Sequence, residues 1–278
     1  MRMIPFTKMH GIGNDCVVID ARVEPYALHE DQIRLIADRR RGVGCDQLVL
    51  IEPPRDGRAV GFLRFYNSDG SEAEACGNAT RCIVARLMQE NNTDEIAVET
   101  RAGFLPAHID RRGLVAVDMG PAQTGWRDIP LSREMDTLHL DLASGPYRDP
   151  VAIGIGNPHC VFFVDDAEDA DPSAYGPAVE HHPLFPERTN VEFVGIQASD
   201  RIRMRVWERG AGVTQACGSG ACAAAVAAAR RELTGRQVEV VLDGGSLYID
   251  WRADNHVVMS GPVAVSFTGV LDDAVGSA

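Results

Sequence analysis

Short apolar runs alternate with turn residues along two long stretches of the chain. β-Branched and aromatic residues dominate the runs, and Gly, Asp and Pro separate them, which is typical of β-strands. The runs are VVID, LVLI, FLRFYN, IAVET and LVAVDM in the first stretch, and VFFV, VEFVGI, IRMRVW, VEVVL and VVMSG in the second. This pattern predicts a structure of two strand-rich halves.

Two segments have helical character instead. Residues 78–89 carry Ile83, Val84, Leu87 and Met88 at helical spacing. Residues 220–233 begin as a run of small apolar residues, mostly alanine. A helix that is apolar on every side must be buried, so we expect a sheet to wrap around it.

Four short matches relate the two halves at a nearly constant offset of 141 to 143 residues. In chain order they pair GIGN at 11–14 with 154–157, Gln47 with Asn190, RFYN at 64–67 with RVWE at 205–208, and ACGN at 75–78 with ACGS at 216–219. Matches in one order at one offset predict an internal duplication. We therefore expect two similar domains, 1–122 and 123–265, that meet near Gly120-Pro121.

Composition narrows the functional class. The 278 residues carry a net charge of −13, which disfavours general binding to nucleic acid or to anionic membranes. No run is long enough to cross a membrane, and no signal peptide is visible, so a cytoplasmic location is expected. The seven cysteines include no CxxC motif and no zinc-ligand spacing. We expect no metal, and a small molecule as the ligand.

Cys76 and Cys217 stand apart because each directly precedes a predicted helix. A helix N-terminus offers free N–H groups and partial positive charge, which favours a thiolate and can also bind a carboxylate. Taken singly, either CG pair could be a capping turn and no more. Because the CG pair occurs twice, once in each half, a catalytic role for the two cysteines is favoured.

If the halves pack about a pseudo-two-fold axis, the two thiols lie on opposite faces of a substrate carbon. One thiolate can then remove a proton while the other thiol returns one from the far side, which inverts the stereocentre. The usual cofactor for such chemistry is pyridoxal phosphate on a lysine, but Lys8 is the only lysine and has no cofactor-site context. We therefore expect no cofactor.

At these residues the sequence resembles the diaminopimelate epimerase family. The similar motifs are KMHGIGND from Lys8, ACGNATRC from Ala75, GNPHC from Gly156 and WERGAGVTQACGSGACAAAV from Trp207. The resemblance implies an isomerase that interconverts LL- and meso-2,6-diaminopimelate without pyridoxal phosphate, in lysine and peptidoglycan-precursor synthesis. It also implies an α/β (α+β) fold of two alike domains, each a barrel-like sheet around a central helix, with the active site in the cleft between them. Residues 266–278 would return to the first domain, and the enzyme would be a homodimer.

The family pattern assigns roles residue by residue. Cys76 and Cys217 match the catalytic acid–base pair, His159 and Glu208 match positions that tune the cysteines, and Phe267 matches a dimer contact. Substrate binding is implied for Asn14, Gln47, Asn67, Gly77, Asn78, Asn157, Asn190, Glu208, Arg209, Gly218 and Ser219. We expect Glu208 to meet the substrate ammonium and Arg209 a carboxylate. Cys45, Cys82, Cys160 and Cys222 are expected to be structural.

Some residues depart from the family pattern, and some interpretations stay open. Cys16 replaces a phenylalanine, Ala79-Thr80 replaces Gly-Ala, and Val213 replaces a glutamate. Asn14 and Asn157 could be turn residues, Glu208-Arg209 could be a surface ion pair, and His159 could be a loop histidine. A proline or hydroxyproline racemase, which would use two cysteines in the same way, is an alternative enzyme function. A thiol redox or binding protein with a regulatory Cys76–Cys217 disulfide is the alternative from another class.

Overall fold

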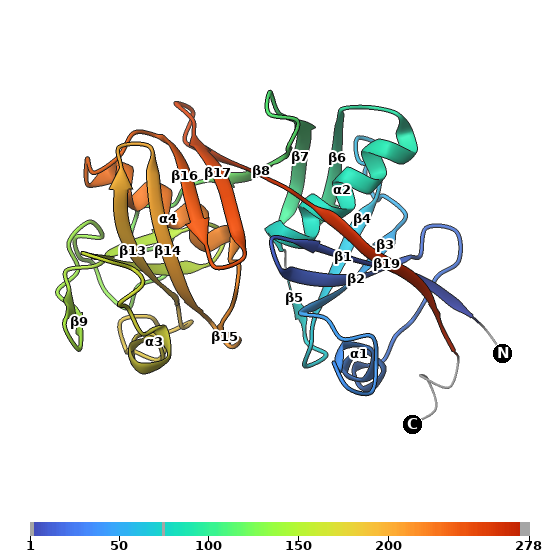
Figure 1. The fold of residues 1–278 in the computed structure, drawn as a ribbon, viewed down its shortest axis with the longest axis horizontal. Coiled ribbons are helices and arrows are strands. Elements are labelled where there is room, and N and C mark those ends of the chain that lie inside the picture. The colour runs from blue at the N-terminus through green and yellow to red at the C-terminus, as the bar shows by residue number, and fades with distance from the viewer. Residues whose placement is uncertain (1–2, 74–75, 273–278) are drawn as a thin grey trace. The chain divides into compact units, whose positions relative to one another are not determined.

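The computed structural model describes residues 3–73 and 76–272, and the chain forms two compact units (Figure 1). The first unit contains the described residues up to Val117 and those from Gly261 onward, and the second contains Asp118–Ser260. The domain limits expected at 122 and 265 stay a prediction. Part of the predicted returning segment, residues 273–278, lies outside the described residues, as does Ala75 of the first ACG motif.

Strands dominate the first unit. Their bounds are β1 (Ile4–Gly11), β2 (Asn14–Asp20), β3 (Gln47–Glu52), β4 (Phe62–Asn67), β5 (Glu72–Ala73), β6 (Glu95–Thr100), β7 (Gly103–Ile109) and β19 (Ala264–Leu271), with helices α1 (Glu30–Ala37) and α2 (Gly77–Asn91). β8 (Val115–Pro121) begins in this unit and ends in the second. β2–β3 and β4–β6 pair in parallel. β1–β2, β3–β4, β4–β5, β6–β7 and β7–β8 are antiparallel, and β19 adds to β1 antiparallel.

The second unit repeats this series of pairings. Its elements are β9 (Ala143–Ser144), β10 (Tyr147–Arg148), β11 (Val151–Gly154), β12 (Pro158–Val164), β13 (Asn190–Ala198), β14 (Arg201–Glu208), β15 (Gly212–Val213), β16 (Gln237–Leu242), β17 (Gly245–Trp251) and β18 (His256–Gly261), with α3 (Pro172–Glu180) and α4 (Gly218–Arg230). β12–β13 and β14–β16 are parallel; β11–β12, β13–β14, β14–β15, β16–β17 and β17–β18 are antiparallel. The common topology agrees with two similar halves.

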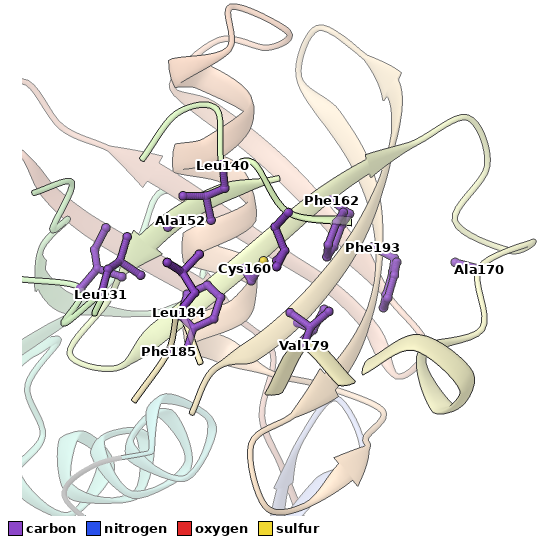
Figure 2. Close-up of a cluster of buried hydrophobic side chains, with 13 residues drawn as sticks. Leu131, Leu140, Ala152, Cys160, Phe162, Ala170, Val179, Leu184, Phe185 and Phe193 are labelled. Carbon is purple, nitrogen blue, oxygen red and sulfur yellow. The ribbon is translucent and has the colours of Figure 1, made fainter. Parts of the chain in front are cut away.

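Each central sheet is buried on both faces, which explains the nearly continuous apolar runs. In β13, Val191 and Phe193 belong to a core with Cys160 and Phe162 of β12 and Val179 of α3 (Figure 2). The rings of Phe162 and Phe193 stack with centroids 5.8 Å apart. Side chains alternate along a strand, so Glu192 and Val194 lie on the opposite face.

α4 occupies that opposite face. It packs against β11, β12, β13, β14, β16 and β17, and every residue from Gly220 to Ala228 is buried. Small side chains allow a helix to approach so many strands at once. The predicted wrapping of the alanine helix is confirmed.

The predicted strands all lie within observed strands, apart from Leu114, which precedes β8. The helix predicted at 78–89 is α2, and the one predicted at 220–233 ends earlier, at Arg230. No helix in the described part of the chain is long and apolar enough to cross a membrane.

Candidate active site

Cys76 is the N-cap residue of α2 in the first unit. Its backbone is extended, at φ −145° and ψ 114°, and its carbonyl accepts a hydrogen bond from the Thr80 N–H at 2.8 Å. Cys76 and Gly77 are half-buried, and Asn78 is buried. The predicted placement of Cys76 at a helix N-terminus is confirmed.

Amide side chains stand at strand ends in the same unit. Gln47 begins β3 and pairs in register with Asn67 at the end of β4, and its Nε2 donates to Asn67 Oδ1 at 3.4 Å. The Oε1 atom of Gln47 is buried and has no hydrogen-bond partner among the described residues. Buried acceptors are rarely left unsatisfied, so Gln47 offers a place for a ligand N–H.

Asn14 opens β2 directly after the Ile12-Gly13 turn, where both residues have positive φ, as a two-residue hairpin requires. Its Nδ2 donates to Asp46 Oδ2 at 3.2 Å. The turn lies against the start of α2, since a Cβ added to Gly11 would lie 3.4 Å from the Asn78 carbonyl oxygen. Asn14 thus lies near the start of that helix.

Lys8 is engaged elsewhere in the first unit. It is buried, and its Nζ lies 2.6 Å from Asp15 Oδ2. Although burial raises the pKa of Asp15, hydrogen bonds from Arg39 and Lys8 outweigh it and hold that pKa well below its usual range. The one lysine of the chain therefore serves an ion pair.

Cys217 is the N-cap residue of α4 in the second unit and is buried. Its Sγ accepts a hydrogen bond from the Gly220 N–H at 3.4 Å and lies 3.7 Å from Ser219 Oγ. Burial raises the pKa of the Cys217 thiol well above its usual value, and the nearby carboxylates Glu208 and Glu192 add to this. The lowered pKa expected at a helix N-terminus is therefore wrong for Cys217, because burial and two acidic neighbours outweigh the helix.

Glu208 ends β14 and is half-buried. Its Oε1 accepts a short hydrogen bond from Thr214 Oγ1. Burial raises the pKa of Glu208, while hydrogen bonds from Thr214 and the Cys217 thiol partly offset the rise. Glu208 is thus in contact with the cysteine it was expected to tune.

His159 is fully buried in β12 and is bonded through both ring nitrogens. Nδ1 lies 2.6 Å from Glu192 Oε1, and Nε2 lies 2.9 Å from Asn157 Oδ1. Asn157 follows Gly156, which has φ +74° in the turn between β11 and β12. His159 is therefore a buried, fixed side chain of a strand and not a loop histidine.

The side chain of Asn190 contacts the backbone of Arg209. Asn190 Nδ2 donates to the Pro158 carbonyl at 3.0 Å, and Asn190 Oδ1 accepts from the Arg209 N–H at 2.9 Å. The exposed guanidinium of Arg209 donates to the Glu187 carbonyl at 3.0 Å. Within residues 3–73 and 76–272, no ion pair joins Arg209 to Glu208, so the surface-pair interpretation does not hold.

Sequence reasoning missed two buried carboxyl groups around these residues. Glu192 bonds to His159, and Glu180 at the end of α3 accepts from Trp207 Nε1 at 2.6 Å and from the Gly210 N–H at 3.0 Å. Glu180 therefore fixes both flanks of Glu208-Arg209. The available signal for Glu192 was a lone charge inside the apolar run VEFVGI.

The other predicted residues lie at the start of α4, on β19 and in the buried core. Gly218 is buried and Ser219 half-buried at the start of α4. Phe267 is 49% exposed on β19, with its ring centroid 6.0 Å from that of Phe6. Cys45, Cys82, Cys160 and Cys222 are buried, as expected. No cluster of His, Cys, Asp and Glu suited to a metal ion occurs among the residues that the structure describes.

Comparison with known proteins identifies the family. The model for "Diaminopimelate epimerase" matches residues 6–125 and 151–266. The diaminopimelate epimerase of Rhodospirillum centenum is 54% identical over 97% of this chain and 93% of its own length. The one from Acidiphilium cryptum is 55% identical over 98% and 97%.

Solved structures share the fold at low sequence identity. A Bacillus anthracis phenazine biosynthesis protein of the PhzF family aligns with a TM-score of 0.69 at 16% identity, over 98% of this chain and all of the other. A hydroxyproline epimerase from Agrobacterium vitis also gives 0.69 at 16% identity, over 99% and 95%. These likenesses confirm the expected mixed α/β fold. From the family match and the two close relatives, the chain belongs to the diaminopimelate epimerase family.

Proposed function

We propose that this protein is an isomerase that interconverts LL- and meso-2,6-diaminopimelate. The observation that carries the proposal is the repeated cysteine at the start of the central helix, once in each unit. Cys76 caps α2 and Cys217 caps α4, and polar side chains stand at the ends of neighbouring strands in both units. The family match and the named relatives support the same substrate.

The reaction needs a base on one face of the α-carbon and an acid on the other. In the proposed cycle one cysteine, as thiolate, removes the α-proton, and the C–H electrons remain on the α-carbon. The other thiol then gives its proton to the opposite face. The proton count balances, and the two cysteines exchange protonation states. That the two thiols face each other across a cleft is itself part of this proposal.

The surroundings of Cys217 support a role as the proton donor of the resting enzyme. Its raised pKa keeps the thiol protonated at neutral pH. Cys76 would then begin as the thiolate. Backbone N–H groups in the first turns of α2 and α4 would bind the carboxylate at the reacting centre and stabilise the carbanion.

Substrate ligands would come from both units. We assign Gln47, with its unsatisfied Oε1, to a substrate N–H, and Glu208 and Arg209 to the ammonium and the distant carboxylate. The proposed set is completed by Asn14, Asn67, Gly77, Asn78, Asn157, Asn190, Gly218 and Ser219. No cofactor is proposed, since Lys8 is held by Asp15.

A homodimer and a cytoplasmic location complete the proposal. β19 is a strand of the first unit with three large apolar side chains that are exposed: Val265, Phe267 and Val270. Exposed apolar side chains on such a strand are suited to a protein–protein contact, and a second copy of the chain is the proposed partner.

The test is incubation of the purified, reduced protein with LL-diaminopimelate, followed by chromatographic separation of the meso form. We expect turnover by the wild type and none by Cys76→Ala or Cys217→Ala. Proline is the comparison substrate. Racemisation of proline without turnover of diaminopimelate would overturn the proposal in favour of the racemase alternative. A reductant-dependent change with no turnover would favour the redox alternative.

A further inference from the structure

Glu192 is a fully buried carboxyl group on the helix-facing side of β13. Its neighbours Val191 and Phe193 face the apolar core shared with α3, so strand alternation turns Glu192 toward α4. Its Oε2 is buried without a hydrogen-bond partner among the described residues. A buried carboxyl with an unsatisfied oxygen costs stability, which marks Glu192 as a residue retained for something other than packing.

Glu192 lies between His159 and the cysteine of this unit. Its Oε1 lies 2.6 Å from His159 Nδ1. A Cβ added to Gly220 would lie 2.9 Å from Glu192 Oε1 and 3.1 Å from Cys217 Sγ. The carboxyl and the sulfur therefore border the same small space, which glycine in the first turn of α4 leaves open.

The ring of His159 links Glu192 to a proposed substrate ligand. An amide oxygen only accepts, so His159 Nε2 must carry a proton to bond Asn157 Oδ1 at 2.9 Å. Nδ1 then shares one proton with Glu192 across 2.6 Å, either as imidazolium with carboxylate or as imidazole with carboxylic acid. In both arrangements Glu192 fixes the ring, and the ring fixes the Asn157 amide.

The titratable groups that face Glu192 come from β12, β14 and the N-cap of α4: His159, Glu208 and Cys217. Burial raises the pKa of Glu192, and His159 opposes the rise. The charge of Glu192 in turn contributes to the raised pKa values of Cys160, Glu208 and Cys217. The charge of Glu192 thus acts on Glu208 and Cys217, the two groups proposed to act at this end of the site.

We propose that Glu192 is a positioning residue: it clamps His159 through Nδ1, so that the ring holds the Asn157 amide in place. Its role in turnover rests on the proposed epimerase function. Its role in holding the ring does not, and the two parts are tested separately.

The first test reads the histidine ring itself. ¹⁵N-edited NMR of the imidazole nitrogens reports which nitrogen carries the proton, and His159→Gln identifies the signals. In the wild type we expect His159 to show a fixed ring with a proton on Nε2. In Glu192→Val, which keeps an apolar strand residue, the two nitrogen shifts should move toward tautomer-averaged values. Glu239→Gln on β16, whose Arg201 contact is 3.7 Å long, is the matched control and should leave them unchanged. Unchanged His159 shifts in Glu192→Val would overturn the clamp.

The second test uses turnover and the isosteric variant Glu192→Gln, which keeps the side-chain shape if the valine variant fails to fold. We expect kcat/KM to fall on the order of tenfold or more, because an acid–base site is misaligned. In a His159→Gln background the same change should cause no further loss, since the residue it acts through is gone. If Glu192→Gln lowers kcat/KM by the same factor in the His159→Gln background as in the wild type, the proposal is overturned. A wild type that is inactive on diaminopimelate would instead refute the proposed function, and the NMR result would stand.

Discussion

The thiol of Cys217 illustrates how burial can outweigh a helix N-terminus. The motif ACGS correctly placed this cysteine before α4, but the expected direction of its pKa shift was wrong. The reason is tertiary: the fold buries the sulfur, and it also brings a carboxyl group at the end of β14 and another within β13 close to it. Local sequence can locate a helix start, but it cannot report which charges distant strands bring to it.

The first prediction follows from that charge. The raised pKa of Cys217 means that its alkylation by iodoacetamide is slow at neutral pH and accelerates as pH rises. Glu208→Gln removes a nearby negative charge, so the thiol pKa should fall and the alkylation profile should shift toward lower pH, on the order of one pH unit. Mass spectrometry of the Cys217 peptide across pH measures this. The Glu239→Gln variant serves as control, and a shift toward higher pH in Glu208→Gln would contradict the electrostatic account.

A second prediction concerns Asp15, the partner of Lys8. Asp15→Asn leaves the buried ammonium of Lys8 without this partner, so the free energy of unfolding at pH 7 should drop by about 3 kcal/mol. Because the folded-state pKa of Asp15 is lowered, its contribution is present above the unfolded pKa of about 4 and is lost as pH falls below it. Urea unfolding at pH 7 and pH 3 should therefore show a difference between wild type and variant that shrinks at pH 3. A constant difference would contradict this reading.

At the scale of elements, the sequence predicted what is periodic and missed what is irregular. Runs such as VEFVGI can be recognised as strands from the sequence because both faces of these strands are buried. α3 was missed because Pro172, Gly176 and Pro177 interrupt helical periodicity, although Asp171 caps it and Gly176 is required where the helix meets Trp207. α1 is a short helix of eight residues with only three buried side chains. Its stability comes from packing that the sequence does not display.

The third prediction tests the tight wrapping of α4. Ala225→Leu adds three carbon atoms where the side chain is 1% exposed, and overpacking should lower the free energy of unfolding by about 1–3 kcal/mol. Ala229→Leu lies on the same helix but is only partly buried, so it should cost clearly less. Chemical denaturation of the pair measures both. Equal stabilities would contradict the view that a closely fitted sheet encloses this helix.

At the scale of the whole molecule, the internal repeat was the most informative feature of the sequence. The offset motifs predicted two alike units, and both units have the same succession of parallel and antiparallel pairings. The repeat also pointed to paired residues, since Gln47 and Asn190 each open the equivalent strand. It could not predict Glu192, whose counterpart in β3 is the apolar Val49. That difference lies where the two halves have diverged chemically.

The fourth prediction concerns assembly through β19. Phe267→Asp places a charge among the exposed apolar side chains of β19, so the proposed homodimer should dissociate to a single 30.1 kDa chain. Analytical ultracentrifugation at micromolar concentration measures this. Val23→Asp, at a side chain that is 97% exposed elsewhere in the same unit, should leave the mass unchanged. A wild type that sediments as one chain would refute the dimer.

The central claim is that one cysteine removes a proton and a different cysteine returns one. Its most direct test is the epimerisation of LL-diaminopimelate by the reduced enzyme in D₂O, stopped early and analysed by ¹H NMR and mass spectrometry. The account predicts that newly formed meso product carries deuterium at the inverted α-carbon, while the unreacted LL form has gained almost none. Product that retains protium at that carbon, or LL substrate that is labelled as fast as product forms, would show that a single group handles the proton and would contradict the account.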